Sequence, residues 1–130
     1  DVVACVDQLK TMITRFHKEK IQVSLFIEPD RQQIDASHES GADSIEIHTG
    51  KYASCEGADQ KKELDRIKDA VAYARSCSLK VHAGHGLRAN NIAPFKHIEG
   101  IDEVNIGHSI ISNAVLYGLT QSIENIFNGI

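Results

Sequence analysis

Two short glycine–histidine turns carry the residues best suited to chemistry. The sequence GHG at Gly84–Gly86 and the sequence GHS at Gly107–Ser109 each follow an apolar, strand-like run. Glycine permits a turn in which successive backbone N–H groups point at one spot, which suits an anion. The second turn precedes a helix expected to begin near Ile110, so its amides would lie at a helix N-terminus. Together the two turns predict a phosphate site.

Ionisable residues also occur on the strand-like runs themselves. Alternation predicts that one set of side chains packs under helices: Val23, Leu25, Ile27, Ile45, Ile47, Val81, Ala83, Val104 and Ile106. The opposite set is mostly polar: Ser24, Phe26, Glu46, His48, Lys80, His82 and Asn105. A buried charge is costly unless it is paired. This second layer therefore either forms a satisfied internal network or reaches a ligand.

Four strands, each followed by a helical segment, would have to position these residues. The strand-like runs are 21–27, 44–50, 79–86 and 103–109. Apolar spacing predicts helices over about 5–19, from Pro29 to Ser40, over 59–77, briefly over 90–97, from Ile110, and over 119–127. Residues 51–58 form the longest irregular stretch near the strand ends, which makes them a lid candidate. Repeated strand–helix units with glycine and ionisable groups at the strand ends are typical of a (β/α)8 barrel, but only four of eight units are present.

Bulk composition excludes several classes of protein. The chain has 130 residues, 42% hydrophobic content and a net charge of −4, which suits one globular domain and argues against a nucleic-acid or anionic-membrane surface. Three cysteines without C-x-x-C spacing favour a reducing cytoplasm. No apolar run reaches membrane-spanning length. Because the chain opens at Asp1 rather than Met, we expect it to be a piece of a longer protein.

Taken in order, four motifs resemble the pyridoxine 5′-phosphate synthase family. The motifs are IQVSLFIEPD, SIEIHTGKYA, LKVHAGHGL and EVNIGHSII. The similarity runs from about Ile21 to the end of the chain. It implies an α/β protein with the TIM (β/α)8 fold, of which this chain carries the last four βα units, strands five to eight, with a preceding and a terminal helix. Residues 1–130 would then be the C-terminal half of a single barrel domain, with the N-terminal half not in this chain.

The resemblance also implies an activity in vitamin B6 biosynthesis. The family condenses 1-deoxy-D-xylulose 5-phosphate with 3-amino-2-oxopropyl phosphate to give pyridoxine 5′-phosphate, phosphate and water. By matching motifs, His85 corresponds to the proton donor and Glu46 to a carboxylate that stabilises the transition state. Gly86, Gly107 and His108 correspond to positions that hold the amino-ketone phosphate. The implied protein needs no cofactor or metal, binds these small phosphorylated substrates, works in the cytoplasm and forms a homo-oligomer.

Two further histidines stay open at this point. His82 stands where relatives are expected to have Asn, so it competes with His85 for the role of acid. Parity places His82 in the barrel layer near Glu46, which favours a hydrogen-bonded interior residue, and we assign the acid role to His85. His48 shares the parity of Glu46 and could touch substrate, but an interior hydrogen bond explains it equally well.

Three rival readings also remain. The chain could belong to another phosphate-binding barrel, a lyase or isomerase, or it could act as a non-catalytic half-barrel binding module. A metal-binding module would have to use Glu46, His48, His82, His85 and His108, but no H-x-x-x-H spacing supports it. The resemblance places a second catalytic histidine, a catalytic glutamate and the binding arginines on strands one to four. We therefore expect this chain alone to bind phosphate weakly and to be inactive.

Overall fold

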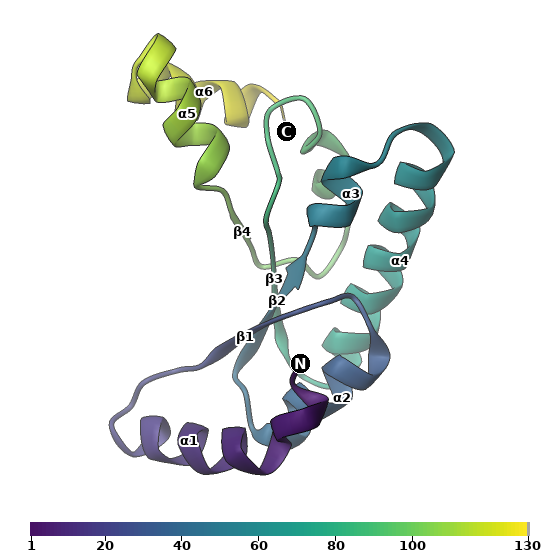
Figure 1. The fold of residues 1–130 in the computed structure, drawn as a ribbon, viewed down its shortest axis with the longest axis vertical. Coiled ribbons are helices and arrows are strands. Elements are labelled where there is room, and N and C mark those ends of the chain that lie inside the picture. The colour runs from purple at the N-terminus through teal and green to yellow at the C-terminus, as the bar shows by residue number, and fades with distance from the viewer. Residues whose placement is uncertain (130) are drawn as a thin grey trace.

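A parallel four-stranded sheet organises the protein. The computed structural model describes residues 1–129. The strands are β1 (Ser24–Ile27), β2 (Ser44–His48), β3 (Lys80–Gly84) and β4 (Glu103–Asn105). They lie side by side in the order in which they occur in the chain, and every neighbouring pair is parallel (Figure 1). All four predicted strands are therefore confirmed, each shorter than the run that predicted it.

Helical segments join the strands, and most of them begin or end close to the predicted residues. They are η1 (Val3–Cys5), α1 (Val6–Lys18), α2 (Arg31–Ser40), α3 (Gly50–Ser54), α4 (Gly57–Ser76), η2 (Ala93–His97), α5 (His108–Tyr117) and α6 (Leu119–Asn128). Helix α2 shows why the boundaries are readable. Its N-cap Asp30 accepts a hydrogen bond from the Gln32 amide at 2.9 Å, and Gly41 ends it with a left-handed φ of 84°.

The expectation that residues 51–58 are irregular, on which the lid candidate was based, is wrong. Most of this stretch is helical, because α3 covers its first half and α4 begins at Gly57. Tyr52 explains the difference: its side chain is buried in the core, and its hydroxyl donates a 2.7 Å hydrogen bond to the Asn91 carbonyl. Such tertiary contacts order a segment in which Gly57 lowers the helix propensity.

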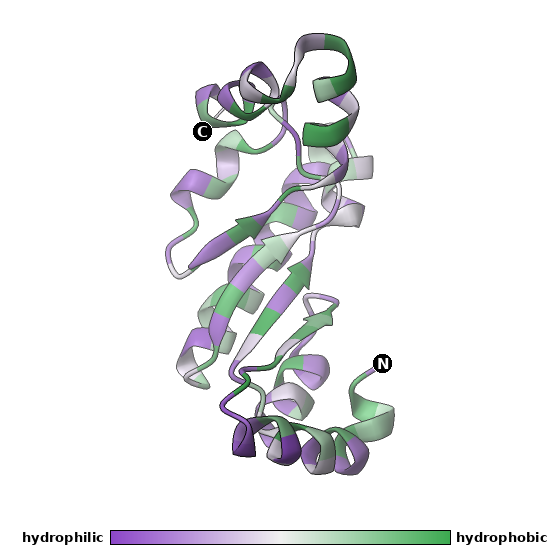
Figure 2. Cartoon of the chain, turned by 90° about the vertical axis from the view of Figure 1, so that its left-hand side faces the viewer, coloured by the Kyte–Doolittle hydropathy of each residue, from purple (hydrophilic) through white to green (hydrophobic). Residues whose placement is uncertain are grey.

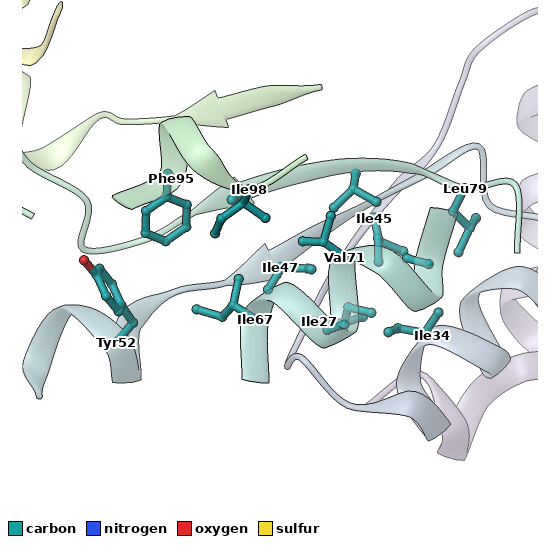
Figure 3. Packing of buried hydrophobic residues seen from close by; sticks show 14 of the residues in the cluster. Ile27, Ile34, Ile45, Ile47, Tyr52, Ile67, Val71, Leu79, Phe95 and Ile98 are labelled. Carbon is teal, nitrogen blue, oxygen red and sulfur yellow. The ribbon is translucent and has the colours of Figure 1, made fainter. Parts of the chain in front are cut away.

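One face of the sheet packs under helices and holds the core. Ile45 and Ile47 of β2, and Val81 and Ala83 of β3, are fully buried. They contact apolar side chains of α2 and α4, including Ile34, Ile67 and Val71 (Figure 3). Each such aliphatic side chain contributes roughly 1.5–3 kcal/mol by leaving water. The predicted helix-facing set is confirmed for the two central strands and for Ile27 of β1. The other members, on or next to the edge strands, are only partly buried: Val23, Leu25, Val104 and Ile106.

The opposite face of the sheet is open. Hydrophilic and hydrophobic residues alternate along the strands (Figure 2). The residues of the second, mostly polar set are exposed or only partly buried, and none of them belongs to the buried core. Phe26 is 54% exposed there, and Glu46, His48 and Asn105 are half-buried. An α/β sheet with sequential parallel strands and helices on one face fits part of a TIM barrel. No helix within residues 1–129 is both long and apolar enough to span a bilayer.

Two carboxylates join the strands at their amino ends. The Asp43 carboxylate accepts hydrogen bonds from the Val23 amide at 2.7 Å and from the His17 ring at 2.9 Å. Asp102, just before β4, makes the corresponding contacts to β3. It accepts hydrogen bonds from the Val81 amide at 2.9 Å and from the Arg75 guanidinium at 2.8 Å. Burial alone would raise the pKa of Asp43, but the bonds from Val23 and His17 outweigh it and lower that pKa below its ordinary value.

Candidate functional site

An open cavity lies at the carboxyl ends of the strands. Its volume is about 1000 Å³, and its walls come from the open sheet face, α3, the loop after β3 and the start of α5. All five residues singled out from the sequence line it: Glu46, His85, Gly86, Gly107 and His108. The structure therefore brings together side chains from three different strand ends, as parallel strands require.

Glu46 reaches across a neighbouring strand. Its Oε2 accepts a 2.6 Å hydrogen bond from Nδ2 of Asn105, although Glu46 lies on β2 and Asn105 on β4. Gly84 of β3 lies between them and pairs in register with Asn105. A Cβ atom at position 84 would overlap the Glu46 carboxylate, so only glycine leaves the path open. The Asn105 amide thus orients the Glu46 carboxylate.

The turn that carries His85 is strained and firmly held. His85 has a φ of 80° and Gly86 a φ of 79°, so a non-glycine residue occupies the left-handed region. Such conformations cost about 1 kcal/mol or more and concentrate at functional sites. Thr49 holds the turn: its buried Oγ1 lies 2.8 Å from the Gly84 carbonyl and 2.7 Å from the His85 carbonyl, and can donate to either. The result is an exposed imidazole at a fixed place on the cavity wall.

Two aromatic rings lie beside His85. The His48 ring lies edge-on to it, with centroids 4.7 Å apart, and the Phe26 ring is 6.4 Å away. Phe26 and His48 also contact one another edge-on at 5.1 Å. On its far side, His48 Nδ1 lies 2.6 Å from Glu28 Oε1. The sequence left two roles open for His48, contact with substrate and a hydrogen bond. The structure places His48 on the cavity wall and also gives it a hydrogen bond to Glu28.

The two glycine turns form adjoining parts of the cavity wall. Gly107 is the N-cap of α5, and no side chain caps the first-turn amides of that helix. The Ser109 hydroxyl donates a 2.9 Å hydrogen bond to the Leu87 carbonyl and so fastens α5 to the loop after β3. Uncapped first-turn amides with a positive dipole end favour a bound anion. The predicted position of Gly107–Ser109 at a helix N-terminus is confirmed.

Asn91 shapes the loop that follows His85. Its Oδ1 accepts from the Arg88 amide at 2.8 Å, and its Nδ2 donates to the Gly86 carbonyl at 3.1 Å. The Arg88 guanidinium donates to the Ala53 carbonyl of α3 at 3.2 Å. Arg88 lines the cavity near Gly86, which brings a cation to the region where a phosphate is expected.

Helix α3 is pinned behind this wall by a buried carboxylate. Glu63 of α4 is 4% exposed and accepts from Lys51 at 3.0 Å and from Arg66 at 2.7 Å. Burial raises the pKa of Glu63, but the hydrogen bonds from Lys51 and Arg66 outweigh burial and hold that pKa below its ordinary value. The ion pair fixes the helix against which Gly86 packs.

His82 lies outside the cavity. Its backbone pairs in register with Glu46, as parity predicted, but its imidazole makes no hydrogen bond with residues 1–129, so the expected interior hydrogen bond stays a prediction. His85, by contrast, lines the cavity, which favours it over His82 for the role of acid. Within the described residues, no three His, Cys, Asp or Glu side chains gather as metal ligands.

Sequence reasoning missed three residues of the site. Glu28 follows the last residue of β1 and continues the parity of Phe26, so extending the alternation by one residue would have found it. Thr49 follows β2 directly, but nothing in its neighbourhood indicates that its hydroxyl reaches β3. Arg88 lies two residues beyond Gly86, where a cation near a predicted phosphate turn was a usable signal.

Known proteins match the chain along its length. The family model described as "Pyridoxal phosphate biosynthesis protein PdxJ" matches residues 1–130. A curated pyridoxine 5′-phosphate synthase of Sulfurihydrogenibium sp. is 53% identical over 124 residues, which cover 95% of this chain and 51% of that protein. Proteins of the same name from Chlorobium chlorochromatii and Aquifex aeolicus are 49% and 46% identical, over 53% and 55% of their own lengths. The chain spans about half the length of the curated relatives it matches.

Proposed function

The chain belongs to the PdxJ family of pyridoxal phosphate biosynthesis proteins, and on this premise we propose that it provides half of a pyridoxine 5′-phosphate synthase active site. The reaction we propose for the whole protein condenses 1-deoxy-D-xylulose 5-phosphate with 3-amino-2-oxopropyl phosphate. Its products are pyridoxine 5′-phosphate, phosphate and water. The observation that carries this proposal is that Glu46, His85, Gly86, Gly107 and His108 all line one cavity.

His85 is the proton donor in this proposal. Schiff-base formation, loss of water and ring closure each require protons to be delivered or removed, and histidine titrates near neutral pH. The ring is exposed on a turn that Thr49 holds in place. Positioned acid–base groups of this kind accelerate proton transfer by about 10²–10⁴-fold.

Glu46 supplies negative charge where the substrate becomes cationic. Asn105 holds the carboxylate at 2.6 Å, so its direction is set before a ligand arrives. A preorganised carboxylate stabilises developing iminium character more effectively than a mobile one, because no reorganisation is needed at the moment of reaction.

The phosphate of the amino-ketone substrate binds at the glycine turns. The amides of Gly86, Gly107 and His108 are the proposed donors, and the dipole of α5 adds positive potential at the same place. Arg88 also lines the cavity, with its guanidinium bonded to the Ala53 carbonyl, and adds a full positive charge. Net charge alone would not attract a phosphate to this chain, so these local donors carry the proposal.

We also propose that the four strands are strands five to eight of a closed (β/α)8 barrel, with residues 1–130 as its C-terminal half. Support comes from the order of the strands, which pair with their sequence neighbours, and from the single helix-covered face. Within residues 1–129, strand β1 pairs with β2 alone and β4 with β3 alone, so each has an edge at which a further strand could pair. The polar face of the sheet would then point into the barrel.

The cytoplasm and a homo-oligomer complete the proposal. The cysteines Cys5, Cys55 and Cys77 are all unpaired, as a reducing compartment allows. Self-association rests on the family resemblance alone. Analytical ultracentrifugation of the purified protein measures the mass in solution directly. A monomer at micromolar concentration would contradict the proposed homo-oligomer.

An activity comparison tests the main proposal. The complete polypeptide that carries this sequence and a polypeptide of residues 1–130 alone are each incubated with both phosphorylated substrates, and pyridoxine 5′-phosphate is measured by its fluorescence. We expect product from the complete polypeptide and none from residues 1–130. Full turnover by residues 1–130 would contradict the half-site, and no product from the complete polypeptide would contradict the assigned reaction.

A further inference from the structure

The contact between Glu28 and His48 fixes which nitrogen of His48 carries a hydrogen. Glu28 Oε1 lies 2.6 Å from His48 Nδ1, a short hydrogen bond. An ionised carboxylate can only accept a hydrogen bond, so Nδ1 must be the donor. In a neutral ring the hydrogen is then on Nδ1 and Nε2 carries the lone pair. A carboxylate that orients an imidazole through Nδ1 is a recurring device where the other nitrogen has a task.

The Nε2 edge of His48 lies close to the His85 ring. A Cβ atom on Gly50 would lie 2.7 Å from His48 Nε2 and 2.9 Å from His85 Cδ2, so both atoms border the same small space. The two rings meet edge to face at an angle of 61°. Glycine at position 50, the first residue of α3, is what allows this approach.

Ring contacts are what orient the His85 side chain. Its imidazole makes no hydrogen bond with any residue from 1 to 129. Its ring neighbours are His48 at 4.7 Å and Phe26 at 6.4 Å. His48 is in turn held by Glu28 and by the edge of Phe26. The backbone of the turn fixes the position of the His85 Cα atom, and the neighbouring rings fix the orientation of its imidazole.

We propose that Glu28 and His48 are positioning residues for His85. Glu28 keeps His48 in the Nδ1–H form and in one orientation, and the His48 ring provides the surface that holds the His85 imidazole over the cavity. The inference deepens the proposed function and rests on it for the kinetic measurement, but the structural measurement is independent of any activity. Removing Glu28 should therefore act at a distance, through His48, on a residue that Glu28 does not contact.

Ring-nitrogen NMR tests the structural half. Long-range ¹H–¹⁵N correlations of the complete polypeptide, recorded about two pH units above the ordinary histidine pKa of about 6.5, report which nitrogen is protonated. We expect His48 to be protonated on Nδ1 in the natural protein. Glu28→Ala should move it toward the Nε2–H form that free histidine prefers, and should shift the His85 ring signals. Glu28→Gln should preserve both, because its amide oxygen still accepts from Nδ1.

Kinetics test the consequence for catalysis. Because a displacement of about 1 Å can cost about 10²-fold in rate, Glu28→Ala should lower kcat by about 10- to 100-fold with KM nearly unchanged. Glu28→Gln should recover most of the loss. His17→Gln is the matched control, since it breaks the other histidine–carboxylate contact, at the opposite end of the sheet. It should change neither kcat nor the His85 signals.

The outcomes separate the two proposals. Unchanged His48 protonation and unchanged His85 signals in Glu28→Ala would overturn the positioning inference, as would a kcat equal to that of the natural protein. A complete polypeptide that forms no pyridoxine 5′-phosphate would instead overturn the proposed function. In that case the NMR comparison would still decide whether Glu28 and His48 position His85.

Discussion

The sheet has a histidine–carboxylate contact at each end, and the two contacts do different work. At the amino ends of the strands, Asp43 accepts from His17 and from the Val23 amide. At the carboxyl ends, Glu28 bonds His48, whose ring then borders His85 and the cavity. The bond lengths are similar, 2.9 Å and 2.6 Å. The chemistry of the pair alone therefore does not reveal its role.

What surrounds each contact distinguishes them. Asp43 bonds a backbone amide between two strands, so its carboxylate joins the sheet together, and His17 merely adds to it from the surface. Within residues 1–129, the Glu28 carboxylate bonds only the His48 side chain, and the His48 ring contacts the exposed His85 imidazole on its strained turn. The Asp43 carboxylate, which bonds a backbone amide, contributes to the free energy of unfolding. The Glu28 carboxylate, which bonds the His48 ring beside His85, positions a reactive group.

The largest effect should come from His85. Replacing it with Ala should lower kcat by about 10²–10⁴-fold, the range for loss of a general acid. The melting temperature should not fall, because the ring is exposed and the residue is strained. Steady-state assays and thermal melts of the complete polypeptide measure both. Activity within a few-fold of the natural protein would remove His85 from the role of donor.

A methyl group at position 84 should have the next largest effect. Gly84→Ala should push the Glu46 carboxylate away from Asn105 and cost about 1–3 kcal/mol in the free energy of unfolding, as overpacking does, with about a 10²-fold loss in kcat. Denaturant melts and kinetics measure these losses.

A double-mutant cycle provides the control for position 84. In a Glu46→Ala background the methyl group has no carboxylate to displace, so Gly84→Ala should cost much less there. Equal costs in both backgrounds would show that the overlap with Glu46 is not the cause.

Asp43→Asn should weaken the fold without weakening catalysis. The lost charge-assisted bonds should cost about 1–3 kcal/mol in the free energy of unfolding, while kcat stays at the natural value. The pKa of Asp43 is lowered on folding, so its stabilisation is complete above the ordinary value of 3.8 and is lost as pH falls through the folded pKa. The natural protein should therefore lose its advantage over Asp43→Asn in urea melts below about pH 3.8. An advantage that persists or grows there would contradict this sign.

The smallest effect should come from His17→Gln. The His17 side chain is 41% exposed, and exposed pairs contribute about 0.2–1 kcal/mol. Asp43 keeps its bond to the Val23 amide in this variant. Thermal melts at two salt concentrations measure the change, which should shrink at high salt. If His17→Gln lowered the free energy of unfolding more than Asp43→Asn does, His17 rather than Asp43 would be the main stabilising partner.

Much of this architecture could be predicted from the sequence, because alternation and apolar spacing are local signals. The four strands, the long helix before β3 and the buried faces of Ile45–Ile47 and Val81–Ala83 follow from them. Residues 51–58 could not, since their helix depends on the burial of Tyr52. The Glu46–Asn105 bond could not either, although both residues were named. It depends on register across β3 and on the absence of a side chain at Gly84.

The left-handed backbone of His85 bears on how this sequence can change over time. Glycine would relieve the strain there by about 1 kcal/mol but would remove the imidazole. Selection for thermal stability and selection for turnover therefore favour opposite residues at this one position. A protein kept only for its stability should drift toward glycine at position 85. Histidine kept at position 85, despite the strain of its left-handed backbone, would indicate that selection for turnover still acts on the protein.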